Sequence, residues 1–251
     1  MPNPWDVGSA VYLQSLGFKA LASTSAGFAW SAGREDNTVT RDMVLAHLKS
    51  LVDAVDIPVN ADFEGGFAHD PKGVAANVTL AVEAGVAGLS IEDYTGDDAG
   101  SLYDVQHAVE RIRAARAAID ATGADVLLTA RTESILFGKP DLTGVIQRLQ
   151  LFAEAGADCL FAPGLRSPED IRAVVSAVSP KPVNIMGAYP ELSVQILASL
   201  GVRRISTGGA LARSAWTGFM ATASDLAEKG TFASLANVMA STQINKVFAK
   251  P

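Results

Sequence analysis

The chain has 251 residues, of which 49% are hydrophobic and 19% are charged, so it can bury a large core and does not resemble a disordered protein. A formal net charge of −7 without a run of lysines or arginines argues against nucleic acid and anionic membranes as partners. No apolar stretch has the roughly 20 residues of a membrane span, and the N-terminus lacks the pattern of a secretory leader. With Cys159 as its single cysteine, we expect a cytoplasmic protein with a buried free thiol.

Short strand-like runs alternate with helical stretches along the chain. Met1–Asp6 resembles the loop at the carboxyl end of a strand, and a helix over Gly8–Leu16 follows. Either the corresponding strand lies upstream of residue 1, or the barrel is completed irregularly. Seven runs rich in Val, Ile and Leu predict strands that are buried on both faces. They are Ala20–Thr24, Pro58–Phe63, Ala87–Glu92, Asp125–Arg131, Cys159–Pro163, Pro182–Met186 and Arg203–Thr207.

Apolar residues recur at helical spacing between these runs. The predicted helices are Arg41–Val55, Ser101–Thr122, Asp141–Ala155, Ser167–Ala177 and Glu191–Leu200. Gly85, Gly156 and Gly201 follow helical stretches and suit the left-handed position that ends a helix. The repeating unit predicts one α/β domain over residues 1–251, a (β/α)₈ TIM barrel with a truncated first strand and a helical tail over residues 232–251.

Charged residues end three neighbouring strands of this predicted barrel. Asp62 and Glu64 end one strand, Glu92 and Asp93 the next, and Arg131 the third. Loops at the carboxyl ends of barrel strands build the active site, so these side chains are expected to converge there. Carboxylates suit Mg²⁺, whereas the three scattered histidines suit zinc poorly. Asp93 could instead cap the following turn, and Arg131 could form a structural ion pair.

A turn of small residues, Thr24–Gly27, follows the first predicted strand. The backbone N–H groups and hydroxyl of Ser25, Ala26 and Gly27 could hold a carboxylate. Ser206–Gly209 resembles a phosphate loop of barrels, and Asn184 is placed to face the mouth.

The ordered motifs resemble the isocitrate lyase/phosphoenolpyruvate mutase superfamily along nearly the whole chain. The matching stretches include Pro2-Asn3-Pro4-Trp5-Asp6, Val59-Asn60-Ala61-Asp62-Phe63-Glu64, Ile91-Glu92-Asp93 and Thr129-Ala130-Arg131-Thr132. The resemblance implies a barrel that depends on Mg²⁺, with Mn²⁺ as an alternative, and acts on small 2-oxo acids. It also implies homodimers or homotetramers in which the last helix, within Phe232–Phe248, passes to a neighbouring subunit.

The resemblance implies a metal site made of acids and one amide. Asp62 matches the main metal carboxylate, and Glu92 matches an acid that holds the metal through water. Asn60 stands where the family often has an aspartate, and Glu64 lies beside this set. Glu35 falls near a further family aspartate, with Asp36 as the alternative register.

The resemblance also implies a substrate site. Arg131 matches the arginine that binds the substrate carboxylate, and Ser25, Ala26 and Gly27 match the turn that holds the carboxylate and the 2-oxo oxygen. Trp5 and Asp6 match a pair that lines the mouth.

The segment Tyr94–Ser101 departs from the family pattern. Lyases of the family carry a Lys-Lys-Cys-Gly-His lid, but this segment has no Cys, Lys or Arg and contains Asp97 and Asp98. Cleavage of isocitrate or methylisocitrate with a cysteine acid is therefore not expected, and an acidic lid would repel a phosphonyl dianion.

The leading hypothesis is a Mg²⁺-dependent lyase or decarboxylase that breaks a C–C bond of a small 2-oxo acid through a metal-stabilised enolate. Tyr94 or His69 would donate a proton. The alternatives are a phosphoenolpyruvate phosphonomutase or other P–C bond enzyme, and a non-catalytic protein that binds 2-oxo acids.

Overall fold

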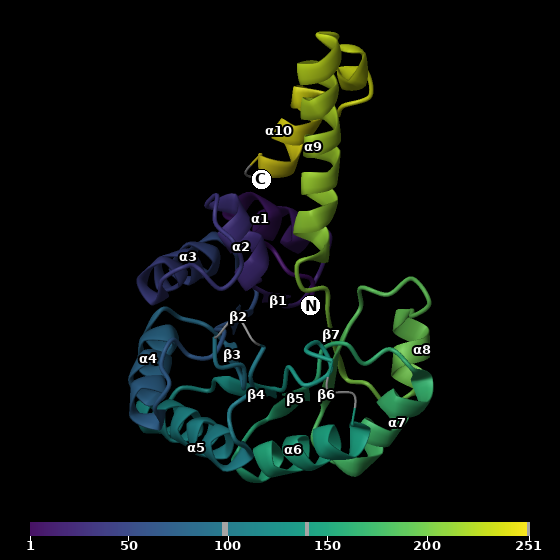
Figure 1. Ribbon diagram of the computed structural model, residues 1–251. Coiled ribbons are helices and arrows are strands. Elements are labelled where there is room, and N and C mark those ends of the chain that lie inside the picture. Colours follow the sequence, from purple (N-terminus) through teal and green to yellow (C-terminus); the bar gives the residue numbers. More distant parts are fainter. Residues whose placement is uncertain (97–99, 139–140, 250–251) are drawn as a thin grey trace.

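The strands form one parallel sheet that curls into a barrel. The computed structural model describes residues 1–96, 100–138 and 141–249 and orders seven strands as β1 to β7 in chain sequence (Figure 1). Each of the seven predicted strands is present, although shorter than predicted. Together they form the predicted (β/α)₈-like barrel. The strands are β1 Leu21–Ala22, β2 Val59–Asp62, β3 Gly88–Glu92, β4 Leu127–Arg131, β5 Cys159–Phe161, β6 Val183–Met186 and β7 Arg204–Ser206.

Helices surround the barrel and connect successive strands. They are α1 Val7–Ser15, α2 Ser25–Ser31, α3 Arg41–Ala54, α4 Pro71–Glu83, α5 Val105–Thr122, α6 Leu142–Glu154, α7 Pro168–Ala177 and α8 Val194–Ser199. Side chains such as those of Thr40 and Ser167 accept hydrogen bonds from amides of the first turn, which stabilises the helix starts. Gly85, Gly156 and Gly201 have φ values of 92°, 105° and 89°, which confirms the predicted left-handed helix ends.

The core lies between the sheet and its helices. Ile91 of β3, Leu128 of β4 and Ile185 of β6 are fully buried in one continuous apolar cluster, so these strands fix the positions of the residues at their carboxyl ends. Cys159 is a buried free thiol, as predicted.

The first three residues bridge β7 and β1, as in the second of the two alternatives, an irregular completion of the barrel. The nitrogen of Met1 donates to the carbonyl of Ile205 in β7 (2.7 Å), and the carbonyl of Pro2 accepts from Ala22 in β1 (3.1 Å). Asn3 extends this bridge, because its amide donates to Ser23 O (2.8 Å) and its Oδ1 accepts from Thr207 N (2.7 Å). The extended N-terminal segment thus fills the position between β7 and β1.

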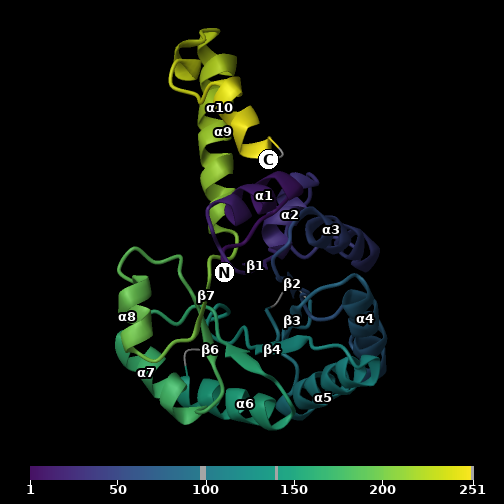
Figure 2. The same cartoon turned by 180° about the vertical axis from the view of Figure 1, so that it is seen from behind.

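The C-terminal region leaves the barrel as a helical arm, defined here as α9 Ala210–Lys229, the 3₁₀ turn Ala233–Leu235 and α10 Ser241–Phe248. The long helix α9 projects from the barrel beside the N-terminus, and α10 folds back to contact α1 (Figures 1 and 2). Within α9 only Ala212 is buried, and Phe219 is 62% exposed. Among the described residues, no helix has the length and apolarity needed to cross a bilayer.

Candidate active site

A cavity of about 170 Å³ opens at the carboxyl ends of the strands. It brings together six residues that the sequence assigns to one site, namely Ser25, Ala26, Asn60, Asp62, Arg131 and Asn184. Asp36, Thr129, Arg204 and Ser206 also line it. Strands β2, β4, β6 and β7 and the start of α2 supply these groups, so the fold places residues from most of the chain around one small volume.

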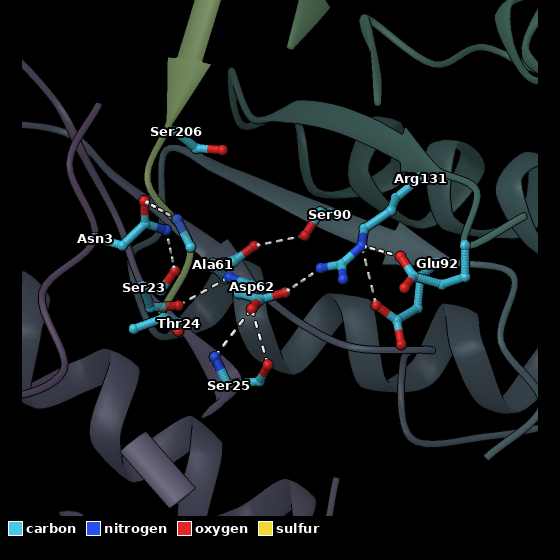
Figure 3. A network of polar contacts seen from close by, with 12 residues as sticks. Asn3, Ser23, Thr24, Ser25, Ala61, Asp62, Ser90, Glu92, Arg131 and Ser206 are labelled. Carbon is cyan, nitrogen blue, oxygen red and sulfur yellow. Dashed lines mark hydrogen bonds and ion pairs between the residues drawn. The ribbon is translucent and has the colours of Figure 1, made fainter. Parts of the chain in front are cut away.

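Asp62 is oriented by the beginning of helix α2. Its Oδ2 accepts hydrogen bonds from Ser25 N (2.9 Å) and Ser25 Oγ (3.0 Å), as Figure 3 shows. Its backbone N–H donates to Ser23 Oγ (2.8 Å). The Asp62 Oδ1 atom lies 3.5 Å from Arg131 Nη1. Asp62 Oδ2 therefore binds the start of α2, and Asp62 Oδ1 faces the guanidinium of Arg131.

Arg131 is surrounded by protein carboxylates. Its Nε donates to Glu133 Oε1 and lies 3.4 Å from Glu92 Oε2, and its Nη1 faces Asp62 (Figure 3). Burial alone would lower the pKa of Arg131, but Glu133, Glu92 and Asp62 raise it well above its ordinary value. In this conformation the guanidinium is an ion-pair centre as well as a candidate substrate ligand.

The carboxyl groups near Arg131 outnumber this one cation, and the pKa values of several of them are raised. Burial, reinforced by Asp62 and Asp36, raises the pKa of Glu64 to about 8. Burial also raises the pKa of Glu92 well above its ordinary value, although Arg131 opposes the shift. Burial and Asp62 raise the pKa of Asp36. A bound cation would relieve this repulsion.

The donor set fits Mg²⁺. Glu64 Oε1 and Asn60 Oδ1 are buried and receive no hydrogen bond from the described residues, so acceptor oxygens remain available within β2 and just beyond its carboxyl end. Within the described ranges, no three His, Cys, Asp or Glu side chains converge into a ready-made cage. Mg²⁺ does not require one, since it keeps several waters and uses one or two carboxylates. Asp62 lines this cavity, Glu92 lines the adjoining one, and both contact Arg131.

The acid contributed by the loop after α2 is Asp36 and not Glu35. Both residues are exposed, but Glu35 lines a separate groove with Trp30 and Arg34, whereas Asp36 lines the cavity with Asp62. In this structure Glu35 does not line the cavity, and Asp36, the alternative register, does. The sequence predicted only a turn at Thr24–Gly27, but the structure has a short helix, α2. The loop that carries Glu35 and Asp36 follows the end of this helix.

Trp5, Asp6 and Gly27 serve packing and capping in this structure and are absent from the cavity lining. Asp6 caps α1, with Ser9 N donating to its Oδ1 (2.7 Å). Gly27 is buried, and a Cβ placed on it would lie 2.8 Å from Trp5 Cβ. Within the expected turn, Ser25 N already donates to Asp62 and Gly27 N to Thr24 Oγ1.

Tyr94 and His69 line a neighbouring cavity of about 190 Å³, together with Glu64 and Glu92. His69 Nδ1 lies 2.6 Å from Tyr103 Oη, and the Tyr94 ring lies 4.8 Å from that of Phe137. The proposed proton donors thus line a different cavity from Asp62 and Arg131. The lid residues Asp97 and Asp98 lie outside the described residues, while Thr95 N donates to Ser101 O (2.9 Å) across the base of that loop.

Two charged residues near the site, Glu133 and Arg204, were not assigned to it from the sequence. Glu133 pairs with Arg131. Its position two residues after Arg131 was the feature of the sequence from which this pair could have been predicted. Arg204 lines the cavity from β7 and donates to Thr129 Oγ1 (2.9 Å). Asp93 does not reach the cavity, because it accepts from Glu133 N (2.9 Å) and pairs with Arg148 (3.2 Å).

Comparisons with known proteins match this geometry. The profile of the phosphoenolpyruvate phosphomutase family matches residues 1–227. A crystal structure of a lyase/mutase homologue from Burkholderia cenocepacia J2315 is 46% identical and covers 100% of this chain and 91% of its own, with a TM-score of 0.95. The structure of 2,3-dimethylmalate lyase, a PEP mutase/isocitrate lyase superfamily member, is 29% identical over 98% of this chain and 88% of its own, with a TM-score of 0.88. The 2-methylisocitrate lyase of Escherichia coli (strain K12) is 32% identical over 77% of this chain and 68% of its own length.

Proposed function

The chain belongs to the phosphoenolpyruvate phosphomutase family, in the isocitrate lyase/phosphoenolpyruvate mutase superfamily, and we propose that it is a Mg²⁺-dependent enzyme that breaks a C–C bond of a small 2-oxo carboxylic acid. The observation that carries the proposal is the cluster of Asp36, Asp62, Glu64 and Glu92 near Arg131, in which three carboxyl groups have raised pKa values that a bound cation would lower by stabilising their ionised forms. Relatives that are named as C–C lyases support the reaction type.

Asp62 and Glu92 would hold the metal, with Asp36, Asn60 and Glu64 as neighbouring oxygen donors. When bound, Mg²⁺ would supply positive charge that polarises the 2-oxo carbonyl. Cleavage of the bond at C3 leaves an electron pair on the substrate, and an enolate is the form in which a neighbouring carbonyl accepts it.

The remaining residues would bind and orient the substrate. Once a metal shares the negative charge of Asp62 and Glu92, Arg131 can turn part of its fork towards a substrate carboxylate. Ser25 would keep Asp62 in place through its two hydrogen bonds, and Asn184 would present its amide from β6. Glu64, whose pKa is about 8, can carry a proton near neutral pH and joins Tyr94 and His69 as a proton-donor candidate in the adjoining cavity.

The sequence of the lid segment, Tyr94–Ser101, limits the range of substrates that we propose. Because Tyr94–Ser101 contains no cysteine, the proposal does not use a thiol acid, and a substrate that loses CO₂ or a neutral fragment fits better than methylisocitrate. The acidic pair Asp97 and Asp98 disfavours a phosphonyl dianion, so phosphonomutase activity is second in rank.

A turnover screen tests the proposal. Oxaloacetate, phosphonopyruvate and 2-methylisocitrate are incubated with the protein in Mg²⁺, in Mn²⁺ and in EDTA, and products are followed by NMR. We expect metal-dependent turnover of oxaloacetate-like acids. Efficient interconversion of phosphonopyruvate and phosphoenolpyruvate would instead select the mutase, and tight binding of all three acids without turnover would select a binding protein.

We also propose that the protein forms homodimers or homotetramers through the helical arm. Among its exposed apolar side chains are Phe219 (62% exposed), Met220 (60%) and Phe232 (77%). At the base of α9, Trp30 and Trp216 line an open groove of about 520 Å³. An arm of this composition is stabilised when a second subunit covers it.

A further inference from the structure

Arg111 of helix α5 is a buried cation that lines the second cavity, the one of about 190 Å³. Its side chain is among the largest that are fully buried, with 1% of the residue exposed. In the described part of the chain its hydrogen-bond acceptors are all backbone carbonyls. Nη1 donates to Glu92 O (3.1 Å), and Nη2 donates to Gly65 O and to Ala68 O (2.9 Å). Because burial of a charge costs free energy, the three carbonyls that Arg111 binds are its distinguishing feature.

The loop after β2 has four consecutive carbonyls, those of residues 65–68, bound by two buried side chains. Arg111 binds the first and the last of them. Asn77 of helix α4 donates to the two between, Gly66 O (2.9 Å) and Phe67 O (3.2 Å). Both donors come from helices on the outside of the barrel, so the loop is held from behind and leaves its other face to the cavity.

The same loop has an unfavourable backbone conformation. Glu64 and Phe67 have φ values of 47° and 55°, which side chains other than that of glycine rarely adopt. Such a conformation persists only where the surrounding contacts fix it. The backbone of Glu92 is joined to this loop, because its N–H donates to Glu64 O (3.0 Å) and its carbonyl accepts from Arg111. One guanidinium therefore fixes the main chain beside both Glu64 and Glu92.

We propose that Arg111 is a positioning residue for the reaction, and that it acts through the backbone that carries Glu64 and Glu92. This inference rests on the proposed function, in which Glu92 holds Mg²⁺ and Glu64 is a neighbouring oxygen donor. Misplacement of such a group by about 1 Å can slow a reaction by about 100-fold. The contact between Arg131 and the substrate carboxylate does not depend on Arg111, so substrate affinity should change little.

Two substitutions separate the geometry of Arg111 from its charge. Arg111→Lys keeps the charge but cannot serve three carbonyls with one planar fork. Arg111→Gln removes the charge and with it the cost of burying a cation, which favours folding. We expect both variants to bind Mg²⁺ about tenfold more weakly in calorimetry and to lower kcat by about tenfold or more. Affinity for oxamate, an unreactive 2-oxo acid analogue, should stay within about threefold in saturating Mg²⁺.

The charge of Arg111 alone would have the opposite effect on the metal. Glu92 lies close enough to raise the pKa of Arg111 against the effect of burial. Removal of this positive charge would therefore tighten Mg²⁺ binding if geometry were unimportant. Tighter binding in Arg111→Gln would overturn the proposal.

Arg116→Lys is the matched control. Arg116 lies on the same helix and is partly buried, but it pairs with Asp158 (2.9 Å) and donates to Val126 O (3.4 Å), which precedes β4. Its replacement should cost stability and leave Mg²⁺ affinity and kcat within about twofold of the wild-type values. Equal losses in Arg116→Lys and Arg111→Lys, or wild-type values in both, would make Arg111 a purely structural residue.

Hydrogen exchange of residues 63–69 in the metal-free protein tests the clamp without turnover. Exchange should be faster in Arg111→Lys than in the wild-type protein, and unchanged in Arg116→Lys. Unchanged exchange in Arg111→Lys would overturn the proposal. A wild-type protein that neither binds Mg²⁺ nor turns over a 2-oxo acid counts against the proposed function, whatever the exchange of this loop.

Discussion

Ser25 and Asp62 are joined by two hydrogen bonds, from the backbone N–H (2.9 Å) and the hydroxyl (3.0 Å) of Ser25 to the same carboxylate oxygen. These two hydrogen bonds connect the start of α2 to the end of β2. The other oxygen of Asp62 remains directed to the Arg131 side of the cavity.

Asp62→Asn should weaken Mg²⁺ binding at least about tenfold, because it removes the charge that the cation needs and retains the size of the side chain. Isothermal calorimetry in the absence of substrate measures the effect. Asp125→Asn changes an exposed carboxylate and should bind Mg²⁺ like the wild-type protein. Equal affinities in all three proteins would remove Asp62 from the metal site.

Arg131→Lys should lower both stability and ligand affinity. A lysine cannot serve Glu92, Glu133 and Asp62 with one planar fork, so we expect a loss of about 1–3 kcal/mol in metal-free unfolding free energy and about tenfold weaker binding of oxamate. Urea denaturation and calorimetry measure the two effects, with the exposed Arg113→Lys as control. Lower stability with normal oxamate affinity would make Arg131 purely structural.

Glu64 predicts a pH dependence with a definite sign. Its pKa is about 8 in the folded protein and 4.5 ordinarily, so between these values the folded state retains a proton that the unfolded chain has lost. The contribution of Glu64 to stability therefore falls as pH rises from about 4.5 to about 8, and is constant above that range. Metal-free Glu64→Gln should be more stable than the wild-type protein at pH 9, with a gap that closes towards pH 5.

Thermal unfolding across pH in EDTA measures this gap, and the exposed Glu83→Gln should show none. Added Mg²⁺ should stabilise the wild-type protein more at pH 9 than at pH 6, because the deprotonated carboxylate attracts it. Parallel stability curves for the wild-type and Glu64→Gln proteins would disprove the raised pKa.

The helical arm predicts the oligomeric state. The double variant Phe219→Lys, Met220→Lys places two charges on an exposed apolar strip and should shift sedimentation towards the monomer without loss of helical circular dichroism. Glu228→Gln, further along the same helix, should not. A wild-type protein that sediments as a monomer at micromolar concentration would end this proposal.

Gly27→Ala should destabilise the fold by about 1–3 kcal/mol through overpacking. The new methyl group would lie 2.6 Å from Thr24 Cγ2 and 2.8 Å from Trp5 Cβ. Chemical denaturation measures the loss. Gly218→Ala, where a Cβ meets nothing within 4 Å, should be neutral or slightly stabilising. Unchanged stability together with lost oxamate binding would return Gly27 to the substrate site.

The sequence predicts the barrel well because the strands are buried on both faces. Runs such as that around Leu128 and Ile91 are continuous and apolar, and glycines mark the helix ends. The helix α9 was not predicted, and within it only Ala212 is buried, so it packs against little of its own subunit. The short helix α2 was missed because its small residues read equally well as a turn.

The candidate site was predicted in part for a similar reason. Asp62, Glu92 and Arg131 stand at strand ends, where the fold dictates their direction. Glu35 and Asp36 are adjacent in a loop, and only the three-dimensional path of the loop decides which of them faces inward. Arg203 and Arg204 are adjacent in a strand, and the inward phase of that strand is not readable from a run as short as Arg204–Ser206.

The bridge that Met1–Asn3 forms between β7 and β1 has a consequence for folding order. Asn3 contacts Thr207 and Gly208, which lie more than 200 positions later, so the ring cannot close until nearly the whole barrel has been synthesised. Until then the β1 end of the sheet and the floor of the cavity stay open to water, and Arg204 remains hydrated. The residues of the acid cluster, from β2 to β4, are therefore synthesised before the segment on which Asn3 closes the barrel.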